Sequence, residues 1–383
     1  MQLIFWQSIL SPHQAPYIRA LAARAACNVT VIAERAMTPD RAAIGWTVPN
    51  LGAARIVLTT DRRTIETVIQ ESPRDSIHIL QGIRGCRLVE ISFPLLRQRS
   101  ARSGILSESG AAKGLGAVSD VGTTLRRARC TFQALRHAAS IDFILAMGNE
   151  GVRWFRTCAF SPERIFPFGY VTDASTETTE ESEKTRAARE FTIAFVGRLV
   201  WLKGGDLLIR SLASAPACNW RLIIVGEGED RSAWQRLAAK LQISDQVTFT
   251  GVLPNKDVKA VIASADLLVL PTRFDGWGTV VNEALMQGVP VLCSDRCGAR
   301  DLLNEAWRGE VFKAGSVGSL RQALAKWIAR GKRTRELTER IRHWSCCIEG
   351  ESVADYFANV LRHVYDGAPR PIAPWYCSGS THD

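Results

Sequence analysis

Two basic side chains, Arg198 and Lys203, lie at one junction between an expected strand and the helix that follows it. The apolar run 191–196 ends at Gly197, Arg198 comes next, and Lys203 precedes a helix that we expect to begin near Asp206. An arginine fork and a lysine point charge beside free main-chain amides suit the two phosphates of a diphosphate. The alternative is an ordinary loop whose basic side chains are simply hydrated.

A second loop carries two glycines and is framed by two carboxylates. Asp275, Gly276 and Gly278 lie between a buried apolar run and a helix, and Glu283 belongs to the first turns of that helix. Glycines let the main chain approach a ligand closely, and the free amides at a helix start favour an anion. A phosphate joined to a polyol would suit both groups. The alternative is a strand-to-helix loop with a capping carboxylate.

The elements around these loops alternate between strand and helix, which predicts an α/β fold with parallel sheets. Parallel strands end at one edge of a sheet, where doubly wound folds bind their ligands, so both loops should lie at the same edge. The expected strands are 3–6, 29–33, 56–59, 77–80, 104–106 and 143–146, then 191–196, 222–225, 247–250, 267–270, 289–293 and 310–312.

Length and composition indicate two ordinary globular domains and no membrane span. The chain has 383 residues, and no apolar run approaches the roughly 18 residues that cross a bilayer. Residues 1–10 are apolar but lack a basic start and a cleavage site, so we interpret them as a strand. The ten cysteines lack paired metal-ligand spacing, which favours reduced thiols in a cytoplasmic protein and no structural metal.

Positive charge is concentrated in the first half of the chain. Residues 1–173 hold 21 Lys and Arg against 13 Asp and Glu, and 20 of the 21 are arginine. Such a field favours a phosphate-bearing substrate or an anionic membrane surface. We expect no nucleic acid partner, because no nucleic-acid-binding motif is present. The alternative is a basic surface that is merely hydrated.

The helix expected at 123–139 offers one specific site for that charge. Four residues, Leu125, Ala128, Phe132 and Leu135, form one stripe, and four arginines fall mostly elsewhere around the helix. One interpretation is a packed helix with a hydrated basic face. The other is a helix that lies against anionic lipid, supported by the nearby Arg97, Arg99 and Arg102.

Four motifs in the second half resemble the retaining, sugar-nucleotide-dependent glycosyltransferases of family 4. Their shared pattern is found at Gly197-Arg-Leu with Lys203-Gly, Gly226-Glu-Gly, Gly251-Val-Leu, and Asp275-Gly-Trp-Gly with Glu283-Ala and Gly288-Val-Pro-Val. The resemblance is strong over residues 191–300 and weaker elsewhere. It implies the GT-B fold, in which two Rossmann-like domains face each other across a cleft.

The resemblance also assigns roles to single residues. Arg198 and Lys203 would hold the donor diphosphate, Glu283 would accept hydrogen bonds from the ribose, and Asp275 would contact the transferred sugar. Asp275 departs from the commoner glutamate, which puts the identity of that sugar in doubt. The other implied donor-binding positions are Gly197, Gly226, Leu253, Gly276, Trp277, Gly278, Thr279 and Val280. The resemblance implies no cofactor and no metal, with the nucleotide sugar as co-substrate.

The first half departs further from the family pattern. Relatives often have a glycine-rich loop after the first strand, and this chain has His13 and Gln14 there. Relatives also place a histidine at the end of the fourth strand, where His78 is either an acceptor-side residue or a structural one. Glu108 is a weaker acceptor-side candidate. Of these, His13 would lie where the two domains close over the substrate.

The resemblance predicts an organisation and an activity for the whole chain. We expect an acceptor-binding domain at 1–173, a polar linker at 174–190, a nucleotide-sugar domain at 191–345, a helix at 346–368 that crosses back, and a loose tail at 369–383. The implied activity is hexose transfer with retention to a lipid-linked saccharide of a bacterial surface polysaccharide, at the inner face of the plasma membrane. The alternatives are a non-catalytic nucleotide-sugar-binding or scaffolding subunit and a sugar-nucleotide epimerase.

Overall fold

The chain divides into two compact units, each built around its own parallel sheet. The computed structural model describes residues 1–43, 46–83, 86–110, 117–173, 190–214 and 220–377. Unit 1 combines Met1–Asp173 with Cys347–Asp383, and unit 2 is Ala174–Cys346. The expected linker at 174–190 lies outside the described residues except for Glu190.

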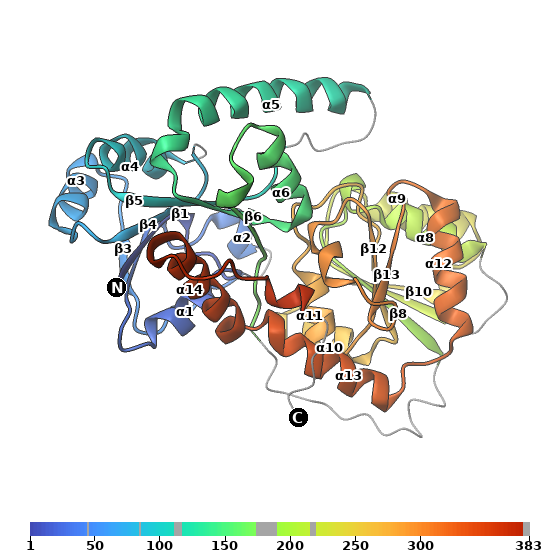
Figure 1. Ribbon diagram of the computed structural model, residues 1–383. Helices are drawn as coiled ribbons and strands as arrows, with labels where there is room; N and C mark the ends of the chain where they lie inside the picture. The colour runs from blue at the N-terminus through green and yellow to red at the C-terminus, as the bar shows by residue number, and fades with distance from the viewer. Residues whose placement is uncertain (44–45, 84–85, 111–116, 174–189, 215–219, 378–383) are drawn as a thin grey trace. The chain divides into compact units, whose positions relative to one another are not determined.

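Unit 1 contains a seven-stranded parallel sheet in the order β3-β2-β1-β4-β5-β6-β7 (Figure 1). The chain starts in the middle of the sheet, adds β2 and β3 on one side, and then returns to β4 on the other side of β1. Its strands are β1 Gln2–Ile9, β2 Asn28–Arg35, β3 Arg55–Leu58, β4 Ile77–Leu80, β5 Arg102–Ser107, β6 Phe143–Met147 and β7 Ile165–Phe168. Its helices are α1 Ala15–Ala22, α2 Pro39–Ala43, α3 Arg62–Glu71, α4 Arg87–Gln98, α5 Ala117–His137, α6 Gly148–Thr157 and α14 Gly350–Asp366.

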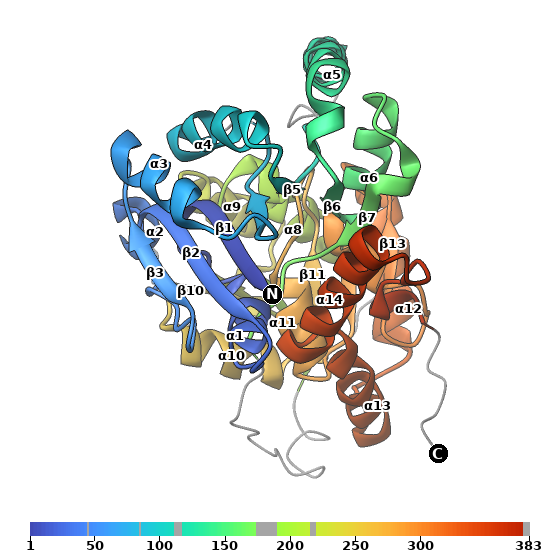
Figure 2. The same cartoon turned by 60° about the vertical axis from the view of Figure 1, so that its left-hand side comes forward.

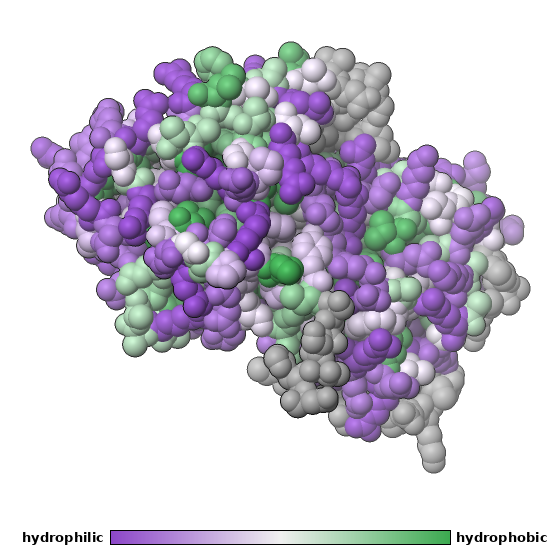
Figure 3. Space-filling model, viewed as in Figure 1, coloured by the Kyte–Doolittle hydropathy of each residue, from purple (hydrophilic) through white to green (hydrophobic). Residues whose placement is uncertain are grey.

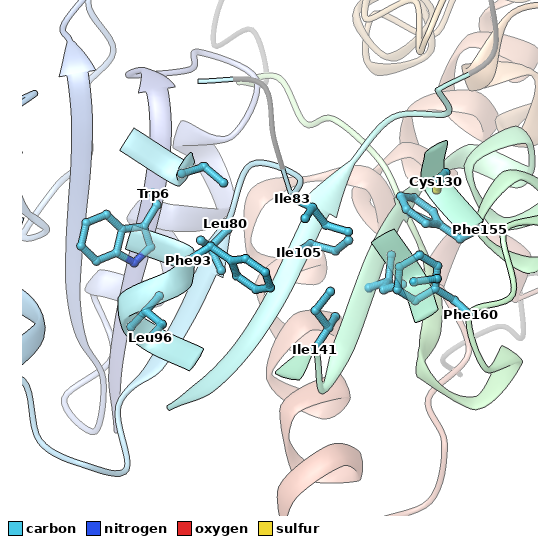
Figure 4. Close-up of a cluster of buried hydrophobic side chains, with 14 of the residues drawn as sticks. Trp6, Leu80, Ile83, Phe93, Leu96, Ile105, Cys130, Ile141, Phe155 and Phe160 are labelled. Atoms are coloured by element: carbon cyan, nitrogen blue, oxygen red, sulfur yellow. The ribbon is translucent and has the colours of Figure 1, made fainter. Parts of the chain in front are cut away.

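Apart from the edge strand β3, the strands of unit 1 alternate their side chains between two apolar layers, as the pleat requires. One layer packs against α3, α4, α5 and α6, and Figure 4 shows part of it, including Trp6, Leu80, Ile105 and Phe93. The opposite face is covered by α1 and α14, which pack against each other. The sheet is therefore buried on both sides except at β3, as parallel sheets usually are.

The last helix, α14, completes the fold of unit 1 although it follows unit 2 in sequence. The ring of Phe357 lies 6.1 Å from Phe5, 6.4 Å from Tyr17 and 6.3 Å from Phe168, measured between ring centroids. The Tyr356 hydroxyl donates a hydrogen bond to the main-chain oxygen of Pro167 at 2.9 Å. The returning segment thus fills the core of unit 1.

Unit 2 contains a six-stranded parallel sheet in the order β10-β9-β8-β11-β12-β13. Helices α8, α9 and α12 belong to the core on one face of this sheet, and α11 contacts both α10 and α13. The strands are β8 Phe191–Val196, β9 Trp220–Val225, β10 Val247–Gly251, β11 Leu267–Leu270, β12 Val291–Ser294 and β13 Gly309–Phe312. The helices are α8 Gly205–Ala213, α9 Arg231–Lys240, α10 Asn255–Ser264, α11 Val280–Met286, α12 Val317–Ala329 and α13 Arg335–Ser345.

Two details differ from the sequence analysis. Strand β7 was not predicted, and it contains Pro167, which lacks an amide hydrogen; a proline is tolerated there because β7 is an edge strand that pairs only with β6. The interpretation of α5 as a packed stripe was wrong, because Leu125, Phe132 and Leu135 are exposed while Cys130 and Ala134 are buried. The views in Figures 1 and 2 both show α5 on the outside of unit 1.

Candidate functional site

Three glycines mark the carboxyl edge of the unit 2 sheet. Gly197 follows β8, Gly226 follows β9 and Gly251 ends β10, with φ angles of 154°, 129° and 80°. The amide of Gly197 donates to Val225 O at 3.0 Å, and the amide of Gly226 donates to Gly251 O at 2.9 Å. A Cβ at Gly226 would overlap the Gly197 carbonyl oxygen, so this close approach requires glycine.

Gly197 also leaves the sheet edge open. A Cβ built on Gly197 would meet no atom within 4 Å. The next residue, Arg198, has an exposed side chain, and the Leu199 that follows is fully buried and anchors the loop. A ligand could therefore reach the main chain at the end of β8 with the Arg198 guanidinium beside it.

Lys203 and Asp275 come from different loops and form an ion pair. Lys203 lies in a short 3-10 turn before α8, and Asp275 lies in the loop between β11 and α11. The Lys203 ammonium contacts the Asp275 carboxylate, and their side chains are only 22% and 15% exposed. The structure thus brings together the two loops that the sequence analysis placed at one edge.

The loop that carries Asp275 is hydrogen-bonded to residues 296–298, which follow β12. The Asp275 amide donates to Arg296 O at 3.0 Å, and the Gly298 amide donates to Asp275 O at 3.1 Å. Gly278 has a φ angle of 91°, and a Cβ there would come within 2.8 Å of both Leu270 and Cys297. Helix α11 starts two residues later, so Gly278, Thr279 and Val280 lie at its N-terminus.

Glu283 lies in the first turn of α11, on the side of α10. Burial removes water from the carboxylate and raises the pKa of Glu283, while the nearby Lys259 opposes that shift. Its side chain is partly accessible to solvent, as is that of Leu253, which follows β10. Glu283 therefore keeps a carboxyl group at the edge of the site, ready to accept hydrogen bonds from hydroxyl groups.

Trp277 does not present its ring to a ligand. The ring is 2% exposed, and its Nε1 donates a hydrogen bond to Asn282 Oδ1 at 2.8 Å. The buried Cys297 thiol donates to the Trp277 carbonyl oxygen at 3.0 Å. Trp277 can therefore serve as the expected donor-binding position only through its main chain.

Sequence reasoning missed Arg273, which joins the loop of Lys203 to the loop of Asp275. Its guanidinium donates to both Asp206 carboxylate oxygens at 2.8 Å, and its carbon lies 4.6 Å above the Trp201 ring centroid. The Arg273 amide also donates to Leu202 O at 2.8 Å. These contacts hold the turn that carries Lys203. No local signal could have revealed them, because the partners are 67 residues apart.

In unit 1, two of the four acceptor-side candidates are buried. Gln14 is 3% exposed, and its Oε1 accepts hydrogen bonds from Gln7 at 2.6 Å and Tyr17 at 3.1 Å. His78 is 2% exposed, and its Nδ1 accepts from Trp6 Nε1 at 3.2 Å. Burial lowers the pKa of His78 to about 4. Gln14 therefore belongs to the interior, contrary to the expectation that it faces an acceptor, and His78 has the structural position that was the alternative for it.

The other two candidates lie near one another at the carboxyl edge of the unit 1 sheet. Tyr170 links them: its hydroxyl donates to Glu108 Oε1 at 2.9 Å, and its ring centroid lies 5.7 Å from that of His13. His13 also meets Trp46 edge-on, with the centroids 4.8 Å apart. Burial raises the pKa of Tyr170, and the Glu108 carboxylate raises it further. Sequence reasoning missed Tyr170 and Trp46.

A pocket of about 330 Å³ opens at the ends of β1 and β2 in the same unit. The Arg41 guanidinium, on its wall, lies 4.6 Å from the Trp46 ring centroid, so the pocket adjoins His13. The lining residues are Ser8, Ile9, Glu34, Arg35, Thr38 and Arg41.

The described residues hold neither a cluster of metal-ligating side chains nor a membrane-spanning helix. In that part of the chain, no group of three or more His, Cys, Asp or Glu side chains is arranged to hold a metal ion. Likewise, no helix that the structure describes is long and apolar enough to cross a membrane.

Comparison with solved structures defines the fold. The chain superimposes on the lipopolysaccharide outer core galactosyltransferase WaaB with a TM-score of 0.68 and 16% identity, covering 94% of this chain and 99% of that one. It matches Anabaena HepE in complex with UDP with a TM-score of 0.71 and 15% identity, at the same coverage. The chain is therefore a two-unit protein of the GT-B fold, as predicted.

Sequence comparison gives a family match within unit 2. Residues 177–344 match the model of the family described as Glycosyl transferases group 1. The D-inositol 3-phosphate glycosyltransferase of Mycobacterium sp. (strain JLS) is 30% identical over 183 residues, which cover 45% of this chain and 41% of that protein. A GDP-mannose-dependent monoacylated alpha-(1-6)-phosphatidylinositol monomannoside mannosyltransferase of Corynebacterium glutamicum is 31% identical over 215 residues, covering 51% and 55%. The chain thus spans about half the length of the curated relatives it matches.

Proposed function

We propose that the chain is a glycosyltransferase that moves a hexose from a nucleotide diphosphate sugar to a hydroxyl group of a saccharide acceptor. The observation that carries this proposal is the contact between Lys203 and Asp275 beside the open glycine edge of unit 2. This is the part of the chain that matches the family. Similar proteins are named for transfer to inositol phosphate and phosphatidylinositol mannoside acceptors.

The site would act mainly on the leaving group. As the bond between the sugar C1 and the phosphate oxygen breaks, negative charge gathers on the departing diphosphate. Arg198 and Lys203 would stabilise that charge, which is the dominant kind of help for such a departure. The amides of Gly278, Thr279 and Val280 would bind the distal phosphate, and Glu283 would hold the ribose hydroxyls.

We further propose that transfer proceeds with retention at C1. The acceptor oxygen would bond to C1 on the face that the diphosphate leaves, through an oxocarbenium-like state, and a departing phosphate oxygen would take the acceptor proton. Asp275 lies at the end of the Lys203 side chain, where it could contact the transferred sugar. His13 and Glu108 remain the candidates for contact with the acceptor.

The acceptor that we propose is a lipid-linked saccharide of a surface polysaccharide or glycolipid, met at the inner face of the plasma membrane. Relatives that act on phosphatidylinositol mannosides support a lipid-linked acceptor. The excess of arginine in residues 1–173 agrees with such a location.

The test is product formation from a panel of nucleotide sugars, with and without lipid-linked saccharide extracts. A transferase releases nucleoside diphosphate only when donor and acceptor are both present, apart from slow hydrolysis, and the anomeric configuration of its product reports retention. An epimerase instead converts the donor without acceptor. A donor that stabilises the protein against heat but never turns over would identify a non-catalytic binding subunit and contradict the proposal.

A further inference from the structure

Helix α5 carries an apolar stripe that the rest of unit 1 leaves uncovered. Leu125, Phe132 and Leu135 are 63%, 60% and 78% exposed, and Ala128 between them is also exposed. Figure 3 shows hydrophobic residues at the top of the molecule, over the position of α5 in Figure 1. Exposed residues gathered on one stripe indicate a binding surface more strongly than single exposed residues do.

The stripe points away from the protein body. At about 3.6 residues per turn, Leu125, Ala128, Phe132 and Leu135 fall within about 80° of arc around the helix. The buried residues Cys130 and Ala134 lie on the opposite side and pack into the core of unit 1. The helix is therefore anchored by one face while its second apolar face is directed outward.

Arginines border the outward stripe. Arg129 and Arg136 flank it directly and Arg126 lies further round the helix, and all three side chains are exposed. Residues 122–137, the part of α5 whose side chains are described, contain no Asp or Glu. Arg97 of α4 adds a further cation near the end of the helix, where its Nη1 lies 3.2 Å from His137 Nδ1.

Two other arginines that the sequence placed with this surface belong elsewhere. Arg99 donates to the carbonyl oxygens of Gln70 and Ser72 at 2.9 Å and so holds the end of α3. Arg102 lies over the Tyr365 ring of α14, 4.8 Å from the centroid. The docking surface is therefore α5 together with Arg97.

An apolar stripe bordered by arginines complements an anionic lipid bilayer. Apolar side chains enter the boundary between headgroups and acyl chains, while arginines meet the lipid phosphates. A second copy of this chain fits less well, because arginines that border the stripe would face arginines of the partner across a self-paired interface. Only one of the apolar faces of α5 is directed outward, so the helix would lie along the membrane surface.

We propose that α5 docks the protein on anionic membrane, with Leu125, Phe132 and Leu135 inserted below the headgroups and Arg126, Arg129 and Arg136 on the lipid phosphates. This docking does not depend on the proposed transfer reaction. It can therefore be tested, and can fail, independently of it.

The test is co-sedimentation of the full chain with vesicles of phosphatidylcholine, with and without phosphatidylglycerol. We expect binding only to the anionic vesicles and a loss of at least about tenfold in the partition coefficient for Leu125→Ser/Phe132→Ser/Leu135→Ser. Arg126→Gln/Arg129→Gln/Arg136→Gln should lose about tenfold or more, and the loss should shrink as salt is added.

Matched controls use exposed residues of the same unit away from α5. Ile56→Ser/Leu58→Ser on β3 and Arg63→Gln/Arg74→Gln remove similar groups, and both should bind vesicles as the unaltered chain does. Thermal unfolding of every variant checks that the fold is kept. As a second readout, amide hydrogen exchange in α5 should slow when anionic vesicles are added.

Three results would overturn the proposal. The first is equal binding to neutral and anionic vesicles, and the second is unchanged binding by both α5 variants. The third is self-association that the Leu125→Ser/Phe132→Ser/Leu135→Ser variant abolishes, with no protection of α5 by lipid, which would assign the stripe to a second copy of this chain.

Discussion

Lys203 and Asp275 form an ion pair that a bound diphosphate would have to share. Both side chains are mostly removed from water, so each needs a partner of opposite charge. Asp275 supplies that partner for Lys203. In the proposed complex the diphosphate would take over part of this role, leaving Asp275 closer to the transferred sugar.

The pairing of Lys203 with either Asp275 or a diphosphate predicts how Asp275→Asn changes stability. Without the Asp275 carboxylate, the poorly hydrated charge of Lys203 has no partner, and we expect a loss of about 1–3 kcal/mol in the free energy of unfolding. Nucleoside diphosphate should restore part of it by pairing with Lys203. Urea unfolding with and without the nucleotide measures both effects. Asp245→Asn, an exposed control, should cost less than about 0.5 kcal/mol. An equal deficit with and without nucleotide would contradict the shared pairing.

Glu283 predicts a pH dependence with a defined sign. Because burial raises the pKa of Glu283, the folded state holds the proton more tightly than the unfolded state. The contribution of this group to stability is thus greatest below the unfolded pKa and falls as pH rises through the folded pKa. Glu283→Gln should lack this fall, so its stability relative to the wild type should improve as pH rises above the unfolded pKa of about 4.3.

The same substitution should weaken donor binding. A carboxylate accepts stronger hydrogen bonds than an amide oxygen, so we expect Glu283→Gln to lower the affinity for nucleotide about tenfold. Calorimetric titration measures this change. Unchanged affinity would show that Glu283 does not contact the donor. In the unfolding experiment, a stability difference between Glu283→Gln and the wild type that does not vary with pH would contradict the raised pKa of Glu283.

His78 predicts a second pH effect, unrelated to the active site. Its pKa is lowered to about 4, so the folded state binds fewer protons than the unfolded state between about pH 4 and pH 6.5. Stability is fully present above the unfolded pKa, and about 3 kcal/mol of it should be lost as pH falls through the folded pKa. His78→Gln, which keeps an acceptor for Trp6, should reduce this loss in acid unfolding curves while transfer activity stays unchanged. A large loss of transfer activity in His78→Gln at neutral pH would indicate that His78 does contact the acceptor.

Among the elements, the loops before α8 and α11 act as one structure because Arg273 joins them. We expect Arg273→Ala to cost about 2–4 kcal/mol, since it leaves Asp206 without its bidentate partner. Arg273→Lys should recover little, because an ammonium cannot reproduce the two parallel hydrogen bonds. A double-mutant cycle with Asp206→Ala measures the coupling, which should be at least about 1.5 kcal/mol. Additive effects of the two substitutions would show that the loops are held separately.

Most helices and strands could be predicted from the sequence, and the exceptions have physical reasons. Apolar runs bounded by glycine or polar residues placed most strands well, because a strand buried on both faces has a strong apolar signal. Strand β7 was missed because Pro167 interrupts its apolar run. For α5 the period was detected correctly, but a stripe pattern alone cannot say whether an apolar face meets the core or solvent.

The candidate site was predictable where motifs carry the chemistry and not where long-range contacts do. Arg198, Lys203 and Asp275 stand in a recognisable pattern, and the structure joins the last two. Arg273 has partners far away in sequence, and the burial of Trp277, His78 and Gln14 depends on how helices cover the sheets. Such burial is a property of tertiary packing, which local residue types do not report.

At the scale of the whole molecule, unit 1 is completed by helix α14, which follows unit 2 in the sequence. Phe357 of α14 contacts rings from α1 and from strands β1, β6 and β7 of the unit 1 sheet. We expect Phe357→Ala to destabilise unit 1 by about 3–5 kcal/mol through the cavity it leaves. Hydrogen exchange should show faster opening of β1, β6 and β7, whereas exchange in β8 and β11 and the affinity for nucleotide should stay unchanged. Equal destabilisation of both sheets would show that the units do not unfold independently.

The proposed mechanism depends above all on Lys203, whose positive charge would stabilise the negative charge on the departing diphosphate. The most direct measurement is the single-turnover rate of nucleoside diphosphate release by Lys203→Ala, beside Arg210→Ala, which removes an exposed cation from the next helix. Lys203→Ala should slow release about 10²–10³-fold at a temperature where thermal unfolding shows the variant to be folded, while Arg210→Ala should match the wild type. Equal rates in the two variants would contradict the account.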